Sequence, residues 1–160
     1  MEIKTKKVLI IDDDSRNIFA LTAVLKEKGI DALFADTRQL IKTDSNFGDA
    51  QPLEQISKKN VVHFFKENSN SVNIVTGFIG STINGETTTL GRNGSNYTAS
   101  LIANYVDAEE LQNYTHVDGI YTANPDLVPD AKKIDRLSFN EANEIANFGA
   151  TILHAKTIIP

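Results

Sequence analysis

The sequence predicts an α/β protein with a mostly parallel sheet and helices on both of its faces. Two observations support this fold class. Short runs of branched aliphatic residues alternate along the chain with longer segments of helical apolar spacing. Strands that alternate with helices are typical of parallel sheets, because each crossover helix packs on the sheet. The length of 160 residues suits one compact domain.

The first half of the chain holds three predicted strands and two predicted helices. Residues 7–11, KVLII, form an apolar run that is too short for a helix. A helix follows, with Asp14 or Ser15 as its N-cap and Gly29 as its stop. After it we expect a strand over 32–36, a polar loop over 41–52, a helix over 57–68 and a strand over 72–80. The predicted buried helix residues are Ile18, Leu21, Leu25, Val61, Phe64 and Phe65.

The second half begins with a threonine-rich and glycine-rich segment. A helix is predicted from Gly94 or Ser95 to about Val106. Residues 111–122 contain a further predicted strand, and the two prolines of residues 123–133 indicate a loop. SFNE, residues 138–141, is a capping box that opens a last helix, which we expect to end near Gly149.

Composition narrows the functional classes. The chain is 41% hydrophobic and 23% charged, with a net charge of −5, which argues against general binding to nucleic acids or anionic membranes. It has no cysteine, so thiolate catalysis and disulfides are excluded, and no His, Asp and Glu spacing predicts a zinc site. No apolar run reaches the length of a membrane span and no signal-peptide pattern occurs, so we expect a cytoplasmic protein.

The turn before the predicted helix, LGRNGSN, combines two glycines with several polar donors. Gly91 and Gly94 let the backbone approach a ligand, and the N–H groups of the first helical turn favour an anion. Arg92 adds a bidentate donor for a carboxylate or a phosphate. The spacing matches neither the phosphate-loop motif nor the dinucleotide motif. A plain glycine turn with Ser95 as N-cap explains these residues equally well.

Three longer motifs follow one another along the second half of the chain. TGFIGSTINGETTTLGRNGSNYTASLIA, THVDGIYTANPDLVPDAKKI and LSFNEANEIANFGATILHAKTIIP occur in this order. Over residues 31–160 the chain closely resembles the catalytic domain of aspartokinases in the amino acid kinase family, with the form fused to homoserine dehydrogenase most similar. The resemblance implies a partial amino-acid-kinase-like fold.

The same resemblance implies transfer of a phosphoryl group from ATP, with Mg²⁺, to the side-chain carboxylate of L-aspartate. It implies an aspartate site at Arg92, Asn93, Gly94, Ser95 and Asn96. It implies a nucleotide site at Thr115, His116, Tyr121, Asn124, Asp126, Thr151 and Ile152. A homo-oligomer is also expected.

Several positions depart from the family pattern. The family opens its domain with a strand and a Lys-Phe-Gly-Gly-Thr-Ser turn, whose lysine neutralises phosphate charge, and this sequence contains no such turn. Asn96, His116, Asn124 and Thr151 replace the acids and the lysine that are common at these positions. The missing lysine predicts impaired catalysis.

Residues 7–30 resemble the first strand and helix of a response-regulator receiver domain. The prediction is therefore a receiver-like segment over residues 1–30, joined near Gly29 to an aspartokinase-like fragment over 31–160. Asp12, Asp13 and Asp14 suit either Mg²⁺ binding or the capping of a helix, and capping is the favoured interpretation. Two other functions stay open: a non-catalytic chimeric scaffold and a receiver-like Mg²⁺-binding module.

Overall fold

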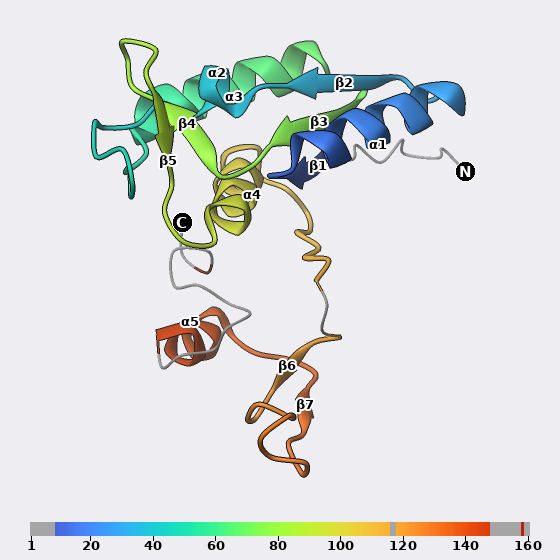
Figure 1. Ribbon diagram of the computed structural model, residues 1–160, viewed down its shortest axis with the longest axis vertical. Coiled ribbons are helices and arrows are strands. Elements are labelled where there is room, and N and C mark those ends of the chain that lie inside the picture. The colour runs from blue at the N-terminus through green and yellow to red at the C-terminus, as the bar shows by residue number, and fades with distance from the viewer. Residues whose placement is uncertain (1–8, 116–117, 148–157, 159–160) are drawn as a thin grey trace.

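The fold is taken from a computed structural model, which describes residues 9–115, 118–147 and 158 (Figure 1). Twelve elements occur in these residues. In chain order they are β1 (Leu9–Asp12), α1 (Ser15–Glu27), β2 (Ala32–Ala35), α2 (Thr37–Leu40), α3 (Glu54–Glu67), β3 (Val72–Thr76), β4 (Ile79–Ser81), β5 (Thr87–Thr89), α4 (Gly94–Tyr105), β6 (Ile120–Tyr121), β7 (Lys133–Ile134) and α5 (Phe139–Asn147).

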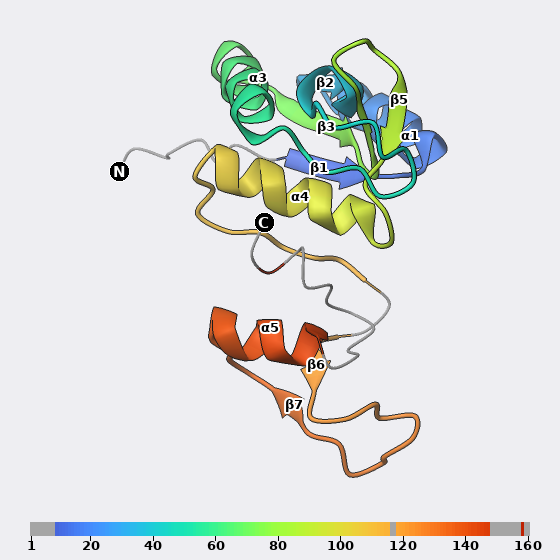
Figure 2. The same ribbon diagram turned by 90° about the vertical axis from the view of Figure 1, so that its left-hand side faces the viewer.

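The main sheet is parallel and has the strand order β1-β3-β2. Its side chains alternate between two faces, as the period of two in a strand requires. Ile74 packs with Ile18 of α1 on one face, whereas Val75 packs with Val61 of α3 and Ile102 of α4 on the other. Figures 1 and 2 show α1 on one side of the sheet and α3 and α4 on the other. The predicted fold class is therefore confirmed.

Helix α1 begins where the sequence predicts, with Asp14 as its N-cap. The Asp14 carboxylate accepts a hydrogen bond from the backbone N–H of Arg16 at 2.8 Å. Asp12 caps the preceding turn by accepting from the backbone N–H of Asp14 at 2.7 Å. Gly29 takes a φ of 74° after the last turn, which is the left-handed conformation that ends many helices. Helix capping thus accounts for two of the three adjacent aspartates.

The Arg16 side chain gives the first testable prediction. Its guanidinium donates hydrogen bonds to the Asp14 carboxylate and lowers the pKa of that carboxyl from 3.8 to about 2. Because the folded pKa lies below the unfolded one, this contribution to stability is present above pH 3.8 and is lost as the pH falls to about 2. We expect Arg16→Gln to return the Asp14 pKa towards 3.8, as measured by an NMR pH titration of the carboxyl carbon.

Arg38 provides the matched control for that titration. It makes the same fork of hydrogen bonds to the carboxylate of Asp36, the N-cap of α2, and lowers the pKa of Asp36 in the same direction. Arg38→Gln should therefore move the Asp36 pKa upwards and leave the Asp14 pKa where it is. An Asp14 pKa that stays near 2 in Arg16→Gln would contradict the assignment.

The strand predicted over residues 72–80 is wrong as a single element. The structure divides it at Gly77 and Phe78 into β3 and β4, and Phe78 takes a left-handed φ of 72°. Strand β4 leaves the parallel sheet and pairs antiparallel with β5, which contains the threonines expected only to lead into the glycine turn. Strands β4 and β5 form a short hairpin over residues 79–89, and β5 consists of three threonines, so it lacks the apolar alternation by which a strand is predicted.

The loop over residues 41–52 is confirmed but is not simply polar. Ile41, Thr43 and Ala50 are buried, and single bridges join Lys42 to Ser81 and Thr43 to Pro52. The short helix α2 precedes this loop and has no counterpart in the predicted elements. The loop therefore packs over β4 and contributes to the core instead of lying free on the surface.

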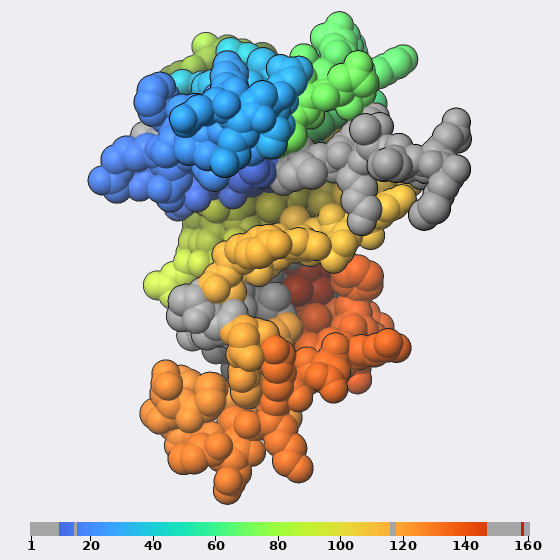
Figure 3. Space-filling model, turned by 90° about the vertical axis from the view of Figure 1, so that its right-hand side faces the viewer, coloured from blue at the N-terminus to red at the C-terminus, as the bar shows by residue number. Residues whose placement is uncertain are grey.

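The C-terminal elements lie apart from the main sheet. The strand predicted within residues 111–122 is only two residues long and pairs antiparallel with β7, so it does not extend the parallel sheet as expected. The capping box is confirmed, because Ser138 and Glu141 each accept a hydrogen bond from the other's backbone N–H. Gly149 lies outside the described residues. Figure 3 shows this part, in orange, at the opposite end of the molecule from α1.

Candidate functional site

The glycine-rich turn joins β5 to α4 through two left-handed residues. Gly91 has a φ of 81° and Asn93 a φ of 56°, and the backbone N–H of Gly94 closes the turn on the carbonyl of Gly91 at 3.1 Å. Helix α4 begins at Gly94 with Asn93 as its N-cap, and the Asn93 side chain makes no capping hydrogen bond. The interpretation of Ser95 as an ordinary N-cap is therefore wrong, because Ser95 already lies in the helix.

The first turn of α4 keeps its donors available. No described residue accepts a hydrogen bond from the backbone N–H of Ser95 or Asn96. The aligned peptide dipoles of a helix place roughly half a positive charge at such an end. This end of α4 can therefore bind an anionic group of a ligand.

A hollow of about 340 Å³ lies in front of this helix end. Its lining combines the residue after β1, one of the two residues between β3 and β4, and the N-cap and first turn of α4: Asp13, Phe78, Asn93, Gly94, Ser95 and Asn96. The hollow thus lies at the carboxyl ends of two neighbouring parallel strands, which is where open α/β sheets bind ligands.

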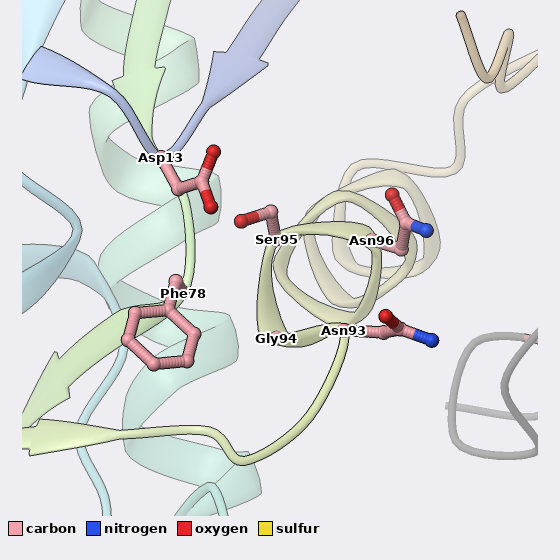
Figure 4. Close-up of a pocket in the computed structure, with 6 residues that line it drawn as sticks. All are labelled: Asp13, Phe78, Asn93, Gly94, Ser95 and Asn96. Atoms are coloured by element: carbon pink, nitrogen blue, oxygen red, sulfur yellow. The ribbon is translucent and has the colours of Figure 1, made fainter. Parts of the chain in front are cut away.

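Figure 4 shows how these side chains are directed. The Asp13 carboxylate and the Ser95 hydroxyl face each other across the hollow, and the Phe78 ring lies beside them next to Gly94. The side chains of Asn93 and Asn96 extend towards the other side of α4. Asp13 is the one ionisable residue in the described lining. One wall of the hollow therefore carries a carboxylate, and the opposite wall carries the free N–H groups of α4.

Hydrogen bonds to Phe78 and close packing hold this arrangement. Thr98, which is fully buried, accepts a hydrogen bond from the backbone N–H of Phe78 at 3.1 Å and donates one to the carbonyl of Gly94 at 2.9 Å. A Cβ at Gly94 would lie 2.7 Å from the Phe78 ring, and one at Gly77 would lie 2.9 Å from Cβ of Ser95. Only glycine at these two positions allows α4 to approach the end of β3 so closely.

Four of the five residues predicted for the aspartate site line the hollow. The exception is Arg92, which is exposed in the turn and does not belong to the lining. Two further lining residues, Asp13 and Phe78, were not assigned to a ligand site from the sequence. From the sequence, Asp13 suits a metal or a helix cap, and Phe78 lies within the strand predicted over residues 72–80. Their positions depend on the sheet pairing that brings β1 beside β3.

The residues predicted for the nucleotide site do not join the hollow where they are described. Tyr121 donates a hydrogen bond to the Asp118 carboxylate at 2.9 Å, which lowers the pKa of Asp118 together with the neighbouring Lys133 ammonium. Asn124 accepts from the backbone N–H of Asp126 at 2.9 Å. Thr115 is also described, whereas the other three, His116, Thr151 and Ile152, lie outside the described residues.

Residues 9–115, 118–147 and 158 contain no group of three or more His, Asp and Glu side chains placed to hold a metal ion. None of their helices combines the length and the apolar character that crossing a bilayer requires.

Comparison with known proteins shows which family this chain is similar to. The sequence profile of the amino acid kinase family matches residues 1–160. Lysine-sensitive aspartokinase 3 of Escherichia coli is 40% identical over 138 residues, which cover 86% of this chain and 31% of the relative. The chloroplastic bifunctional aspartokinase/homoserine dehydrogenase 1 of Arabidopsis thaliana is 39% identical over 143 residues, 88% of this chain and 16% of that protein.

Solved structures agree with these sequence matches. The crystal structure of E. coli aspartokinase III in complex with aspartate and ADP is similar with a TM-score of 0.84 and 38% identity, over 89% of this chain and 32% of that one. The crystal structure of aspartate kinase from Clostridium acetobutylicum is similar with a TM-score of 0.65 and 28% identity. The match covers 91% of this chain and 31% of that one. The chain therefore spans about a third or less of the length of these relatives.

Proposed function

Because the chain belongs to the amino acid kinase family, we propose that it is part of an aspartate kinase and that its hollow binds L-aspartate. The observation that carries the proposal is the hollow itself. Four residues of the predicted aspartate site, 93–96, line it at the open end of α4. The similar E. coli structure was solved with aspartate and ADP, which are a substrate and a product of the reaction proposed for this chain.

The free donors of α4 suit one carboxylate of an acidic amino acid. The backbone N–H groups of Ser95 and Asn96 and the Ser95 hydroxyl can donate hydrogen bonds to its oxygens. Arg92 lies in the preceding turn and has no described ion-pair partner, so its guanidinium is available for a second carboxylate. A dicarboxylic ligand therefore suits this end of the helix.

We propose ATP as the phosphoryl donor and Mg²⁺ as the accompanying ion. Phosphoryl transfer depends mainly on positioning and on neutralisation of charge, and Mg²⁺ supplies positive charge for the phosphates. The Asp13 carboxylate is exposed and has no described partner, and it is an oxygen ligand of the kind that Mg²⁺ prefers. The nucleotide-site residues named from the sequence remain predictions.

Replacement of Arg92 by alanine tests the aspartate site. A hydrogen bond to a charged group contributes about 1.5–3 kcal/mol, so we expect Arg92→Ala to weaken aspartate binding by about tenfold to a hundredfold. Isothermal titration of aspartate, with and without a non-hydrolysable ATP analogue, measures the change. Arg136→Ala is the matched control, because Arg136 is also exposed but lies between β7 and α5. Equal affinity of the Arg92 and Arg136 variants would contradict the role of Arg92.

The receiver-like character of residues 7–30 remains a second proposal. β1 and α1 are a complete strand–helix unit, packed on β3 and β2 through Ile18, Ile74 and Ala32, which is compatible with it, and the amino acid kinase profile covers these residues too. Such a unit can replace the opening of another parallel α/β domain without disturbing the rest. Failure to take up phosphate from acetyl phosphate would exclude a working receiver. A homo-oligomeric assembly and a cytoplasmic location are likewise predictions.

A further inference from the structure

Two Asn-Gly pairs occur in the sequence, at residues 84–85 and 93–94. Asparagine is a chemically labile residue, and a following glycine favours its spontaneous deamidation, because glycine has no side chain to hinder its own backbone nitrogen and is conformationally free. Asn84 and Asn93 are both exposed, and neither side-chain amide makes a hydrogen bond with a described residue. The backbone around each glycine therefore decides which pair can react.

The first pair, Asn84 and Gly85, lies in the turn between β4 and β5. Residues 83–87 are all exposed, and a Cβ at Gly85 would meet no atom within 4 Å. The backbone N–H of Gly85 donates one hydrogen bond, to the carbonyl of Thr82 at 3.0 Å. Figure 1 shows this turn at the tip of the hairpin, on the far side from α4. Water can replace the single hydrogen bond when the turn opens, so opening costs little free energy.

The second pair, Asn93 and Gly94, is held by hydrogen bonds and by packing. The carbonyl of Asn93 accepts from the backbone N–H of Tyr97 at 3.1 Å, and the backbone N–H of Gly94 donates to the carbonyl of Gly91 at 3.1 Å. Gly94 is buried, and a Cβ there would lie 2.7 Å from the Phe78 ring. Rotation of the peptide group between Asn93 and Gly94 would break both hydrogen bonds and displace the start of α4, so the fold protects this pair.

We propose that Asn84 is a site of spontaneous deamidation and isoaspartate formation, and that the fold protects Asn93 from the same reaction. The proposal does not depend on the aspartate site, because the tip of the hairpin lies outside the lining of the hollow.

The reaction requires water and no other reagent. The backbone nitrogen of Gly85 attacks Cγ of Asn84 and closes a succinimide ring, while the bond from Cγ to the amide nitrogen breaks. The amide nitrogen leaves as ammonia and takes up the proton that the backbone nitrogen loses. Water then opens the ring. Attack on the backbone carbonyl gives isoaspartate, whose main chain is longer by a methylene, and attack on the side-chain carbonyl gives aspartate. Either product adds a carboxylate close to Glu86 in the sequence.

Peptide mapping of the whole chain after incubation at mildly alkaline pH tests the proposal. Trypsin cleaves after Arg92 and so places the two pairs in separate peptides, whose deamidation is measured by mass spectrometry. In the folded chain we expect Asn84 to react at least about tenfold faster than Asn93, which corresponds to about 1.4 kcal/mol of protection against local opening. In urea the two rates should agree within about threefold, because neither pair then has a folded environment.

Asn84→Gln is the variant that isolates the first pair. It keeps an amide at this position, but glutamine would have to close a larger ring, which is slower. Isoaspartate is measured by methyl transfer from S-adenosylmethionine with an isoaspartate methyltransferase, and the signal of the folded variant should fall to background. Circular dichroism before and after incubation checks that the chain stays folded. Equal rates at Asn84 and Asn93 in the folded chain would overturn the proposal, as would an isoaspartate signal that persists in Asn84→Gln.

Discussion

Ile102→Ala is expected to lower the free energy of unfolding by about 2–5 kcal/mol. Ile102 lies on α4, is fully buried, and belongs to the cluster that joins α3 and α4 to Val75 of the main sheet. Truncation removes three carbon atoms from a closely packed region and leaves a cavity that the surrounding residues only partly fill. Because a whole domain is stabilised by only about 5–15 kcal/mol, the loss should be large in a urea titration.

Ile83→Ala is the matched control for this truncation. Ile83 lies between β4 and β5 with 67% of its surface exposed, so the same change of side chain should alter stability by less than about 0.5 kcal/mol. Equal destabilisation by the two variants would show that α4 does not pack on the sheet as described. The aspartate site would then lose its support as well, since α4 provides its donors.

Aspartate-dependent formation of ADP is expected to be slower than in ordinary kinases by two to three orders of magnitude. Kinases typically turn over at about 1–100 s⁻¹, and loss of one group that stabilises transition-state charge costs about a hundredfold to a thousandfold. The described lining of the hollow contains one ionisable residue, Asp13, and that residue is negative. No described lysine or arginine lines the hollow to neutralise the phosphoryl group as it is transferred.

A coupled assay with saturating ATP and Mg²⁺ measures this turnover, and a reaction without aspartate gives the background. Binding is measured separately by calorimetry, so that a slow chemical step is distinguished from an empty site. Turnover above about 1 s⁻¹ would contradict the expected impairment. Aspartate binding together with slow turnover would support a site that is formed but lacks a catalytic cation.

Prediction from sequence was most successful where local pattern decides the structure. The four branched residues 8–11, the cap at Asp14 and the stop at Gly29 identify the first strand and helix without any tertiary information. The capping box at Ser138 did the same for α5. These signals are local because helix ends must satisfy their own backbone groups with nearby side chains.

The sequence by itself determined the fold class, the main helices and the family resemblance, because apolar periodicity and ordered motifs are properties of the chain alone. Only the tertiary structure decided that Asp13 faces Ser95, although 82 positions separate them in the sequence. The parallel pairing of β1 with β3 brings the end of β1, and with it Asp13, close to the start of α4. The tertiary structure also decided that Phe78 takes a left-handed conformation, which its hydrogen bonds with Leu90 and Thr98 hold. Both features depend on contacts between separate segments of the chain, which no local pattern encodes.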